Sequence, residues 1–211
     1  MSNSELAQAE RRSLCDLMLG VGPDHATLCE GWTAADLAAH LVVRERRPLA
    51  GPGIVLGGPF ARYTKRAMDK LIERHSFEHL VELVRSGPPR LLRPADGAMN
   101  LVEFFVHHED LRRATPSSAR RTNIDTIEDA LWAQSTRRFK MLTRKLDNID
   151  LTVRDPARGD KRLGGGLRPV TIIGPISEIS LYLFGRRSIA RVEIVGHTAA
   201  CADLVAGRLG V

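Results

Sequence analysis

The sequence predicts an α+β protein, with a helical bundle over residues 1–146 and a small α+β unit over residues 147–211. In the first part, apolar side chains recur at the three- and four-residue spacing of amphipathic helices. After residue 146, short alternating apolar runs are separated by turns rich in Gly, Pro and Asp, as in a small sheet. The 211 residues can bury a real core, and 43% hydrophobic with 27% charged residues is typical of a globular chain.

Helix starts and stops define the elements of the bundle. Thr33 is a suitable N-cap for the second helix, and Asp36 stands three residues later in the capping-box position. That helix should end before Pro48, and the Gly- and Pro-rich residues 51–59 favour no regular element. The expected helices cover residues 4–19, 33–47, 62–74, 77–86, 100–113 and 124–146.

The second unit is expected to mix strands and helices. Alternating residues predict strands at 149–153, 170–173 and 191–195, and residues 155–166 have the composition of turns. Helices are expected at 176–184, where Pro175 suits the first turn, and at 198–209.

The positive charge of the chain is concentrated in one region. The formal net charge is +6, and residues 137–168 carry ten basic and four acidic side chains, so the rest of the chain is balanced. This cluster indicates a solvated arginine-rich face, or else a field that attracts anionic substrates or the carboxylates of a thiol cofactor.

An all-α DNA-binding regulator is the weaker alternative. Residues 33–41 superficially resemble one helix of a helix-turn-helix, but a recognition helix should follow after a short turn. Pro48 and residues 51–59 interrupt the chain first, and the basic cluster lies far from this helix. No nucleic-acid partner is therefore expected.

The cysteines and the hydropathy pattern predict a cytoplasmic protein. Cys15, Cys29 and Cys201 are widely spaced and form no CxxC pair, which disfavours both a disulfide framework and a thiolate zinc knuckle. Residues 1–12 are polar, unlike a signal peptide. No stretch approaches the roughly 20 apolar residues that cross a bilayer, so no membrane partner is expected.

Three side chains are candidate metal ligands. His40 lies within the apolar run of residues 37–43 and needs a hydrogen-bond partner or a metal. Glu103 and His107 are four residues apart, so a helix brings them to one face about 5–6 Å apart. A buried histidine with a satisfied hydrogen bond, and a Glu–His or Glu–Arg pair at a helix interface, are the alternatives that the residues themselves leave open.

The combination of these residues is what favours a metal. Bundles hold metals with inward side chains from separate helices, and two imidazoles with one carboxylate suit zinc, nickel or iron(II). Three protein ligands leave positions for water or substrate, as in reactive sites. Asp36 is a weaker candidate ligand, because its role in capping the helix already accounts for it. Residues 108–110 are expected to support the site or lie at the surface.

Two segments resemble a known superfamily. The run Cys29-Glu30-Gly31-Trp32-Thr33-Ala34-Ala35-Asp36-Leu37-Ala38-Ala39-His40-Leu41 resembles the GW(T/S)xxDLxxHL motif of DinB-like metal-binding bundles. Within that superfamily it is most similar to the mycothiol-dependent maleylpyruvate isomerase-like proteins of actinobacteria. Leu181-Tyr182-Leu183-Phe184-Gly185-Arg186 is similar to a segment that precedes the last strand of this family.

The resemblance implies a fold, a ligand set and a chemistry. It implies an up-down four-helix bundle in which His40, Glu103 and His107 bind a divalent metal, usually zinc, and it implies that Arg186 reaches towards substrate or thiol. The partners would be mycothiol and a small electrophilic substrate, in an isomerase, thiol transferase or hydrolase reaction. A metal-binding protein without catalysis is the alternative. The insert at residues 48–62 departs from the family pattern, so the identity of the substrate is not inferred from the family.

Overall fold

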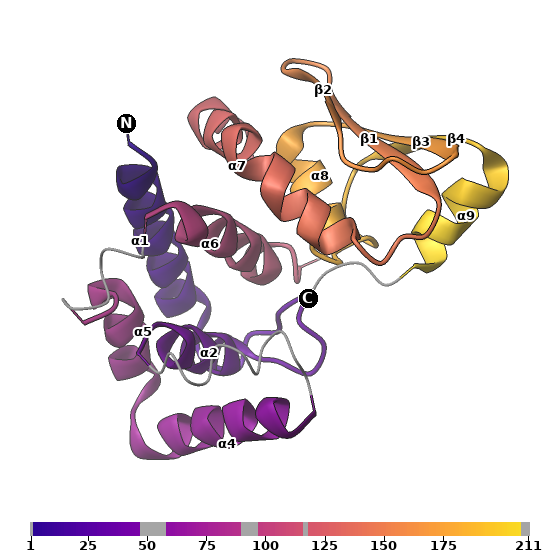
Figure 1. Cartoon of the computed structure of the whole chain (residues 1–211). Coiled ribbons are helices and arrows are strands. Elements are labelled where there is room, and N and C mark those ends of the chain that lie inside the picture. Colours follow the sequence, from indigo (N-terminus) through magenta and orange to yellow (C-terminus); the bar gives the residue numbers. More distant parts are fainter. Residues whose placement is uncertain (1, 47–57, 90–96, 116–117, 208–211) are drawn as a thin grey trace. The chain divides into compact units, whose positions relative to one another are not determined.

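The computed structural model describes residues 2–46, 58–89, 97–115 and 118–207, and residues 58–61 and 97–100 by their backbone alone. These residues form two compact units, residues 1–120 and residues 121–211 (Figure 1). The α+β class predicted from the sequence is confirmed. The boundary expected after residue 146 stays a prediction, and α7 (Asp125–Thr143) groups with the second unit because it packs against α8 (Ile176–Leu183).

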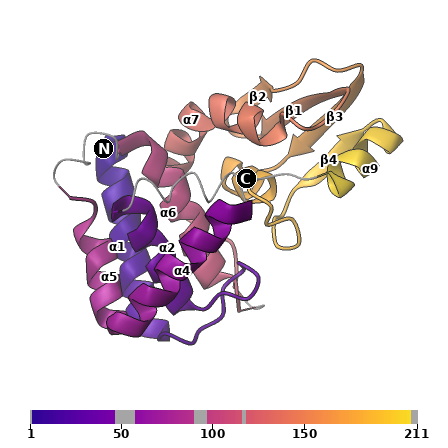
Figure 2. The same ribbon diagram turned by 60° about the horizontal axis from the view of Figure 1, so that its bottom comes forward.

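The named elements of the first unit are all helices (Figure 2). Helix α6 packs along α1, α2 packs against α4 and α5, and α1 also contacts α5. A shared core of fully buried side chains includes Leu14, Met18, Leu37, Leu41 and Phe104. The helices are α1 (Asn3–Val21), α2 (Ala34–Arg46), α4 (Gly58–Arg74), α5 (Phe77–Ser86) and α6 (Gly97–Arg112).

A buried ion pair joins the helices of this unit. The Arg11 guanidinium of α1 grips the Glu45 carboxylate of α2 with both terminal nitrogens, at 2.7 Å each. It also donates to the Val84 carbonyl of α5 at 2.7 Å and lies 4.4 Å from the ring centroid of Phe104 in α6. One side chain therefore holds four helices in register.

Burial makes the Cys15 thiol inert in the folded chain. Desolvation raises its pKa to about 11, against weaker lowering by Arg85 and Arg11. Alkylation at pH 8 should therefore modify the half-buried Cys29 and Cys201 but spare Cys15 until the chain unfolds. The folded state holds the Cys15 proton more tightly than the unfolded chain does. The resulting contribution of Cys15 to the free energy of unfolding is therefore complete below the unfolded pKa of about 8.5 and is lost as pH rises towards 11. Mass spectrometry checks the labelling, and equal rates at Cys15 and Cys201 would contradict it.

The second unit is built on a four-stranded sheet of order β2-β1-β3-β4. The central pair β1–β3 is parallel, and the two outer pairs are antiparallel. Alternate β1 residues, Ile149, Leu151 and Val153, are buried on one face, as their pattern predicts. The elements that follow α7 are β1 (Ile149–Asp155), β2 (Gly159–Arg162), β3 (Arg168–Ile173), α8, β4 (Glu193–Gly196) and α9 (Thr198–Ala206).

The prediction of turns throughout residues 155–166 was wrong, because this segment contains β2. The strand pairs with β1 at the sheet edge, where Arg154 lies opposite Asp160 and forms an ion pair with it at 2.8 Å. Its short, polar, solvent-facing sequence has no apolar alternation, so the hydrophobic pattern carries no strand signal there. The backbone turns at Gly159, whose φ of 97° suits glycine.

Ion pairs engage at least four of the ten basic side chains in the cluster at residues 137–168. Arg158 contacts the carboxylates of Glu128, Asp129 and Asp155, and Arg154, Arg162 and Arg168 each pair with an aspartate of the same unit. This pairing weakens the field that the residue count alone suggested. Within the described ranges, no helix is long and apolar enough to cross a membrane.

Candidate metal centre

The loop before α2 positions His40. Residues Cys29–Trp32 form a turn closed by the Trp32 N–H donating to the Cys29 carbonyl at 2.9 Å, and Gly31 has a φ of 75°, which favours glycine. Thr33 and Asp36 then form the predicted cap: the Thr33 N–H donates to Asp36 Oδ2 at 2.9 Å, and the Asp36 N–H approaches Thr33 Oγ at 3.4 Å. The Asp36 carboxylate thus serves the helix start.

The same loop is attached to α6. The Leu28 N–H donates to the Asp110 carbonyl at 3.0 Å, and Thr27 Oγ donates to the Trp32 carbonyl at 3.0 Å. These bonds fix the start of α2 against the C-terminal half of α6. Side chains one to two turns along each helix can therefore meet.

His40, Glu103 and His107 come together between α2 and α6. The His40 and His107 ring centroids are 5.3 Å apart, nearly perpendicular, and Trp32 flanks His40 at 5.0 Å. Glu103 Oε2 lies 3.7 Å from His107 Nε2. Both histidines are buried. The three residues are thus neighbours, and that they bind a metal stays a prediction.

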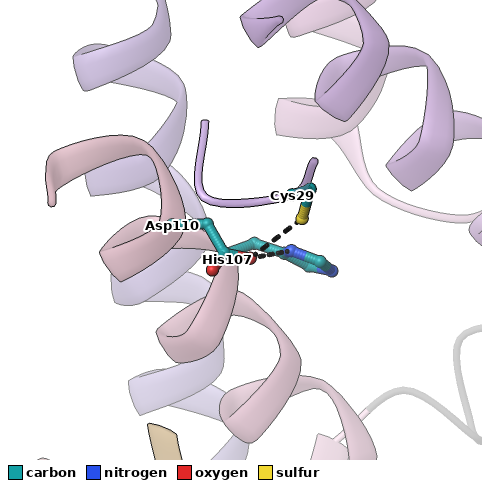
Figure 3. Close-up of side chains that lie close together, drawn as sticks. All are labelled: Cys29, His107 and Asp110. Atoms are coloured by element: carbon teal, nitrogen blue, oxygen red, sulfur yellow. Dashed lines mark hydrogen bonds and ion pairs between the residues drawn. The ribbon is translucent and has the colours of Figure 1, made fainter. Parts of the chain in front are cut away.

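The opposite edge of the His107 ring faces Asp110 and Cys29 (Figure 3). His107 Nδ1 lies 3.0 Å from Asp110 Oδ2, and the Cys29 thiol donates to the same oxygen at 3.4 Å. Ligand atoms of Cys29, His107 and Asp110 all lie within 4.8 Å of one another, the kind of group that holds a metal ion. His107 thus presents one nitrogen to each of two alternative donor sets.

The charges around His107 favour a cation at this place. Burial by itself lowers the pKa of His107, but the hydrogen bonds to Asp110 and Cys29 and the charges of Asp110 and Glu103 outweigh it and raise the pKa to about 9. At neutral pH, without a metal, the ring is therefore protonated. A divalent ion can take the place of that proton.

One donor distance, between His107 and Glu103, fits a metal on the Nε2 side, although the ligand atoms of His40, Glu103 and His107 do not all lie within 4.8 Å of one another as those of Cys29, His107 and Asp110 do. The 3.7 Å between His107 Nε2 and Glu103 Oε2 is too long for a hydrogen bond. Two donors at ~2.1 Å from a tetrahedral zinc ion are about 3.4 Å apart, close to the observed spacing. The Nδ1 contact with Asp110 is a normal hydrogen bond, and metal-bound histidines usually donate their other N–H to a carboxylate in this way.

The residues next to this group were only partly predicted. Asp110 supports His107 as expected, but none of residues 108–110 lies at the surface. His108 Nδ1 contacts Glu10 of α1 at 2.8 Å, and Glu109 pairs with Arg112 and Arg113. Helical spacing turns these side chains away from Glu103, but towards α1 and the end of α6 rather than towards solvent.

Two other sequence predictions have different outcomes. Arg186 belongs to the second unit, where its guanidinium donates to the Phe184 carbonyl at 2.6 Å, and its role towards substrate stays a prediction. Most of the insert at residues 48–62 lies outside the described residues. Cys29 was missed as a possible ligand because a lone cysteine in a loop has no pairing signal in the sequence.

Comparison with known proteins decides the fold. No family model and no curated protein matches the sequence. Two solved structures match: a histidine-to-alanine mutant of the mycothiol-dependent maleylpyruvate isomerase (TM-score 0.61, 14% identity) and the mycothiol-dependent maleylpyruvate isomerase itself (TM-score 0.53, 17% identity). Each alignment covers 93% of this chain and 90% of the other. This chain has the maleylpyruvate isomerase fold.

The maleylpyruvate isomerase fold extends over both units of the chain. The coverage explains why the helical bundle and the small mixed sheet occur together, as the sequence resemblance implied. At 14–17% identity the likeness establishes the fold, and function is argued from the residues of the site.

Proposed function

We propose that this chain is a divalent-metal-binding enzyme that uses a low-molecular-weight thiol, mycothiol or a close analogue, on a small electrophilic molecule. Isomerisation, thiol transfer and hydrolysis are the reaction classes that suit such a site. The observation that carries the proposal is the meeting of His40, Glu103 and His107 with Asp110 behind the ring. The fold supports it, since both solved structures are named for a mycothiol-dependent isomerase.

The proposed roles follow from the donor set. His40, Glu103 and His107 would hold the ion, with zinc the best match and nickel or iron the alternatives. A divalent ion with one carboxylate and two neutral imidazoles keeps a net positive charge and lowers the pKa of a thiol or water that binds to it. Asp110 holds the His107 ring in orientation through Nδ1, and the Trp32 ring shields His40 on the other side.

Elemental analysis followed by a thiol screen tests the proposal. Protein purified without chelators is expected to carry about one divalent ion per chain, in keeping with a three-ligand site. Mycothiol together with electrophilic substrates should then give a product. That product should not form without the protein, or with protein whose metal a chelator has removed. Protein that neither carries nor takes up a divalent ion would contradict the whole proposal. Stoichiometric metal with no thiol-dependent reaction would leave the non-catalytic metal-binding alternative.

A further inference from the structure

Two residue pairs face each other across the candidate metal centre. Helix α2 carries His40 and Arg44 one turn apart, and α6 carries Glu103 and His107 one turn apart. His40 faces His107, with ring centroids 5.3 Å apart, and Arg44 faces Glu103, with Nε 3.7 Å from Oε2. A guanidinium therefore lies next to the carboxylate proposed as a metal ligand.

The Arg44 end is the more open end of the centre. Side-chain exposure rises from 0% at Asp110 and 9% at His107 to 16% at Arg44 and 24% at Glu103. Solvent thus reaches the group at Arg44 and Glu103. A small molecule that reaches this end of the centre from solvent meets the Arg44 guanidinium and the Glu103 carboxylate.

The charge balance changes when a cation is present. In the metal-free chain, the Glu103 carboxylate has both Arg44 and His107 beside it at 3.7 Å. A divalent ion on Glu103 places a second cation next to Arg44, so the positive charge at this end of the centre increases. An arginine in this position offers a planar fork of N–H donors to an incoming anion.

We propose that Arg44 is an anion-binding residue of this centre and selects small molecules that carry a carboxylate near the atom that reaches the metal. The inference rests on the proposed function and adds the chemical class of its ligands. That carboxylate can belong to the second substrate or to a thiol that carries a free carboxylate. An uncharged thiol of the same size gains nothing from the guanidinium, whereas a carboxylate gains a charge-assisted contact.

Cobalt-loaded protein tests the inference by absorption rather than by turnover. Thiolate binding to cobalt produces a charge-transfer band, so thioglycolate and 2-mercaptoethanol can be titrated directly. Replacing Arg44 with Gln should cut the preference for thioglycolate by about tenfold, the scale of one charge-assisted contact. Arg44→Lys should keep part of it, because a point charge remains. Comparing variants cancels the difference in acidity between the two thiols.

A second arm separates the two sources of the carboxylate. Acetate is titrated into the complex with 2-mercaptoethanol, and its binding is read from the same band. Acetate binding that Arg44→Gln abolishes assigns Arg44 to a separate substrate, whereas loss of the thioglycolate preference alone assigns it to the thiol. Arg66→Gln, at an exposed position of α4, removes the same charge elsewhere and should change neither titration.

Three results would overturn the inference. If wild-type protein and Arg44→Gln show the same preference between the two thiols and neither binds acetate, the inference is wrong while the proposed function stands. An Arg44→Gln variant that binds cobalt much more weakly but keeps its thiol preference makes Arg44 a support for Glu103 instead. Wild-type protein that takes up no cobalt overturns the inference together with the proposed function on which it rests.

Discussion

Replacing His107 with Ala is expected to remove bound divalent metal from the purified protein almost completely. The change deletes the ring that both donor sets share, since Nε2 faces Glu103 and Nδ1 faces Asp110 and Cys29. Losing a direct ligand costs more than losing a supporting partner of a ligand, which alone weakens metal binding about 10- to 100-fold. Elemental analysis of the purified variant is the measurement, and full metal retention would contradict the site.

Two further variants distinguish the donor sets. If the ion binds on the Nε2 side, Glu103→Gln loses metal and Cys29→Ser keeps it, because Cys29 then lies behind the ring, where its thiol donates to Asp110. The reverse pattern would place the ion among Cys29, His107 and Asp110. His75→Ala is the matched control, since this exposed imidazole stacks on His79 at the turn between α4 and α5. Circular dichroism checks that each variant keeps its helices.

Replacing Arg11 with Ala is expected to lower the free energy of unfolding by about 3–5 kcal/mol, the cost of breaking a buried ion pair. The Glu45 carboxylate is 2% exposed and would be left buried without its cation. The Val84 carbonyl and the Phe104 ring would also lose their contacts with the guanidinium. Urea unfolding followed by circular dichroism measures the change.

The neighbouring residue and a paired replacement serve as controls. Arg12 is exposed on α1, so Arg12→Ala should change stability by less than about 0.5 kcal/mol. Joint replacement of Arg11 and Glu45 by Met leaves no unpaired charge and should recover much of the loss, as buried pairs replaced by apolar residues often do. A loss below about 1 kcal/mol for Arg11→Ala alone would show that water or another group takes over the Glu45 carboxylate.

Local patterns predicted the elements of the fold well. The cap formed by Thr33 and Asp36 could be predicted because it depends on residues three apart. The alternation of β1 could be predicted because one of its faces is apolar. The edge strand β2 was not readable, since neither of its faces is buried and its partner is fixed by the register with Arg154. Hydrophobic periodicity reports burial, and an exposed strand leaves no trace in it.

Part of the candidate centre could likewise be predicted from local sequence, and part could not. Glu103 and His107 share a helix face by spacing alone, and His40 was a candidate because it is a lone imidazole in an apolar stretch. The contacts of Cys29 with Asp110 and of Arg44 with Glu103 join segments far apart in the sequence. Their approach depends on how α2 and its preceding loop dock on α6. No local pattern encodes that docking, so the second donor set and the anion-binding residue emerged only from the three-dimensional arrangement.

The positions of the proposed ligands couple metal binding to the stability of the bundle. Helix α6 packs along α1, whereas α2 packs against α4 and α5, and the proposed ligands come from α2 and α6. An ion held there would be a removable link between α2 and α6. By mass action, a ligand present at 100 times its Kd stabilises the folded form by about 2.7 kcal/mol. Availability of metal in the surroundings would thus set the resistance of the whole bundle to unfolding, so the apo chain becomes the form most exposed to proteolysis.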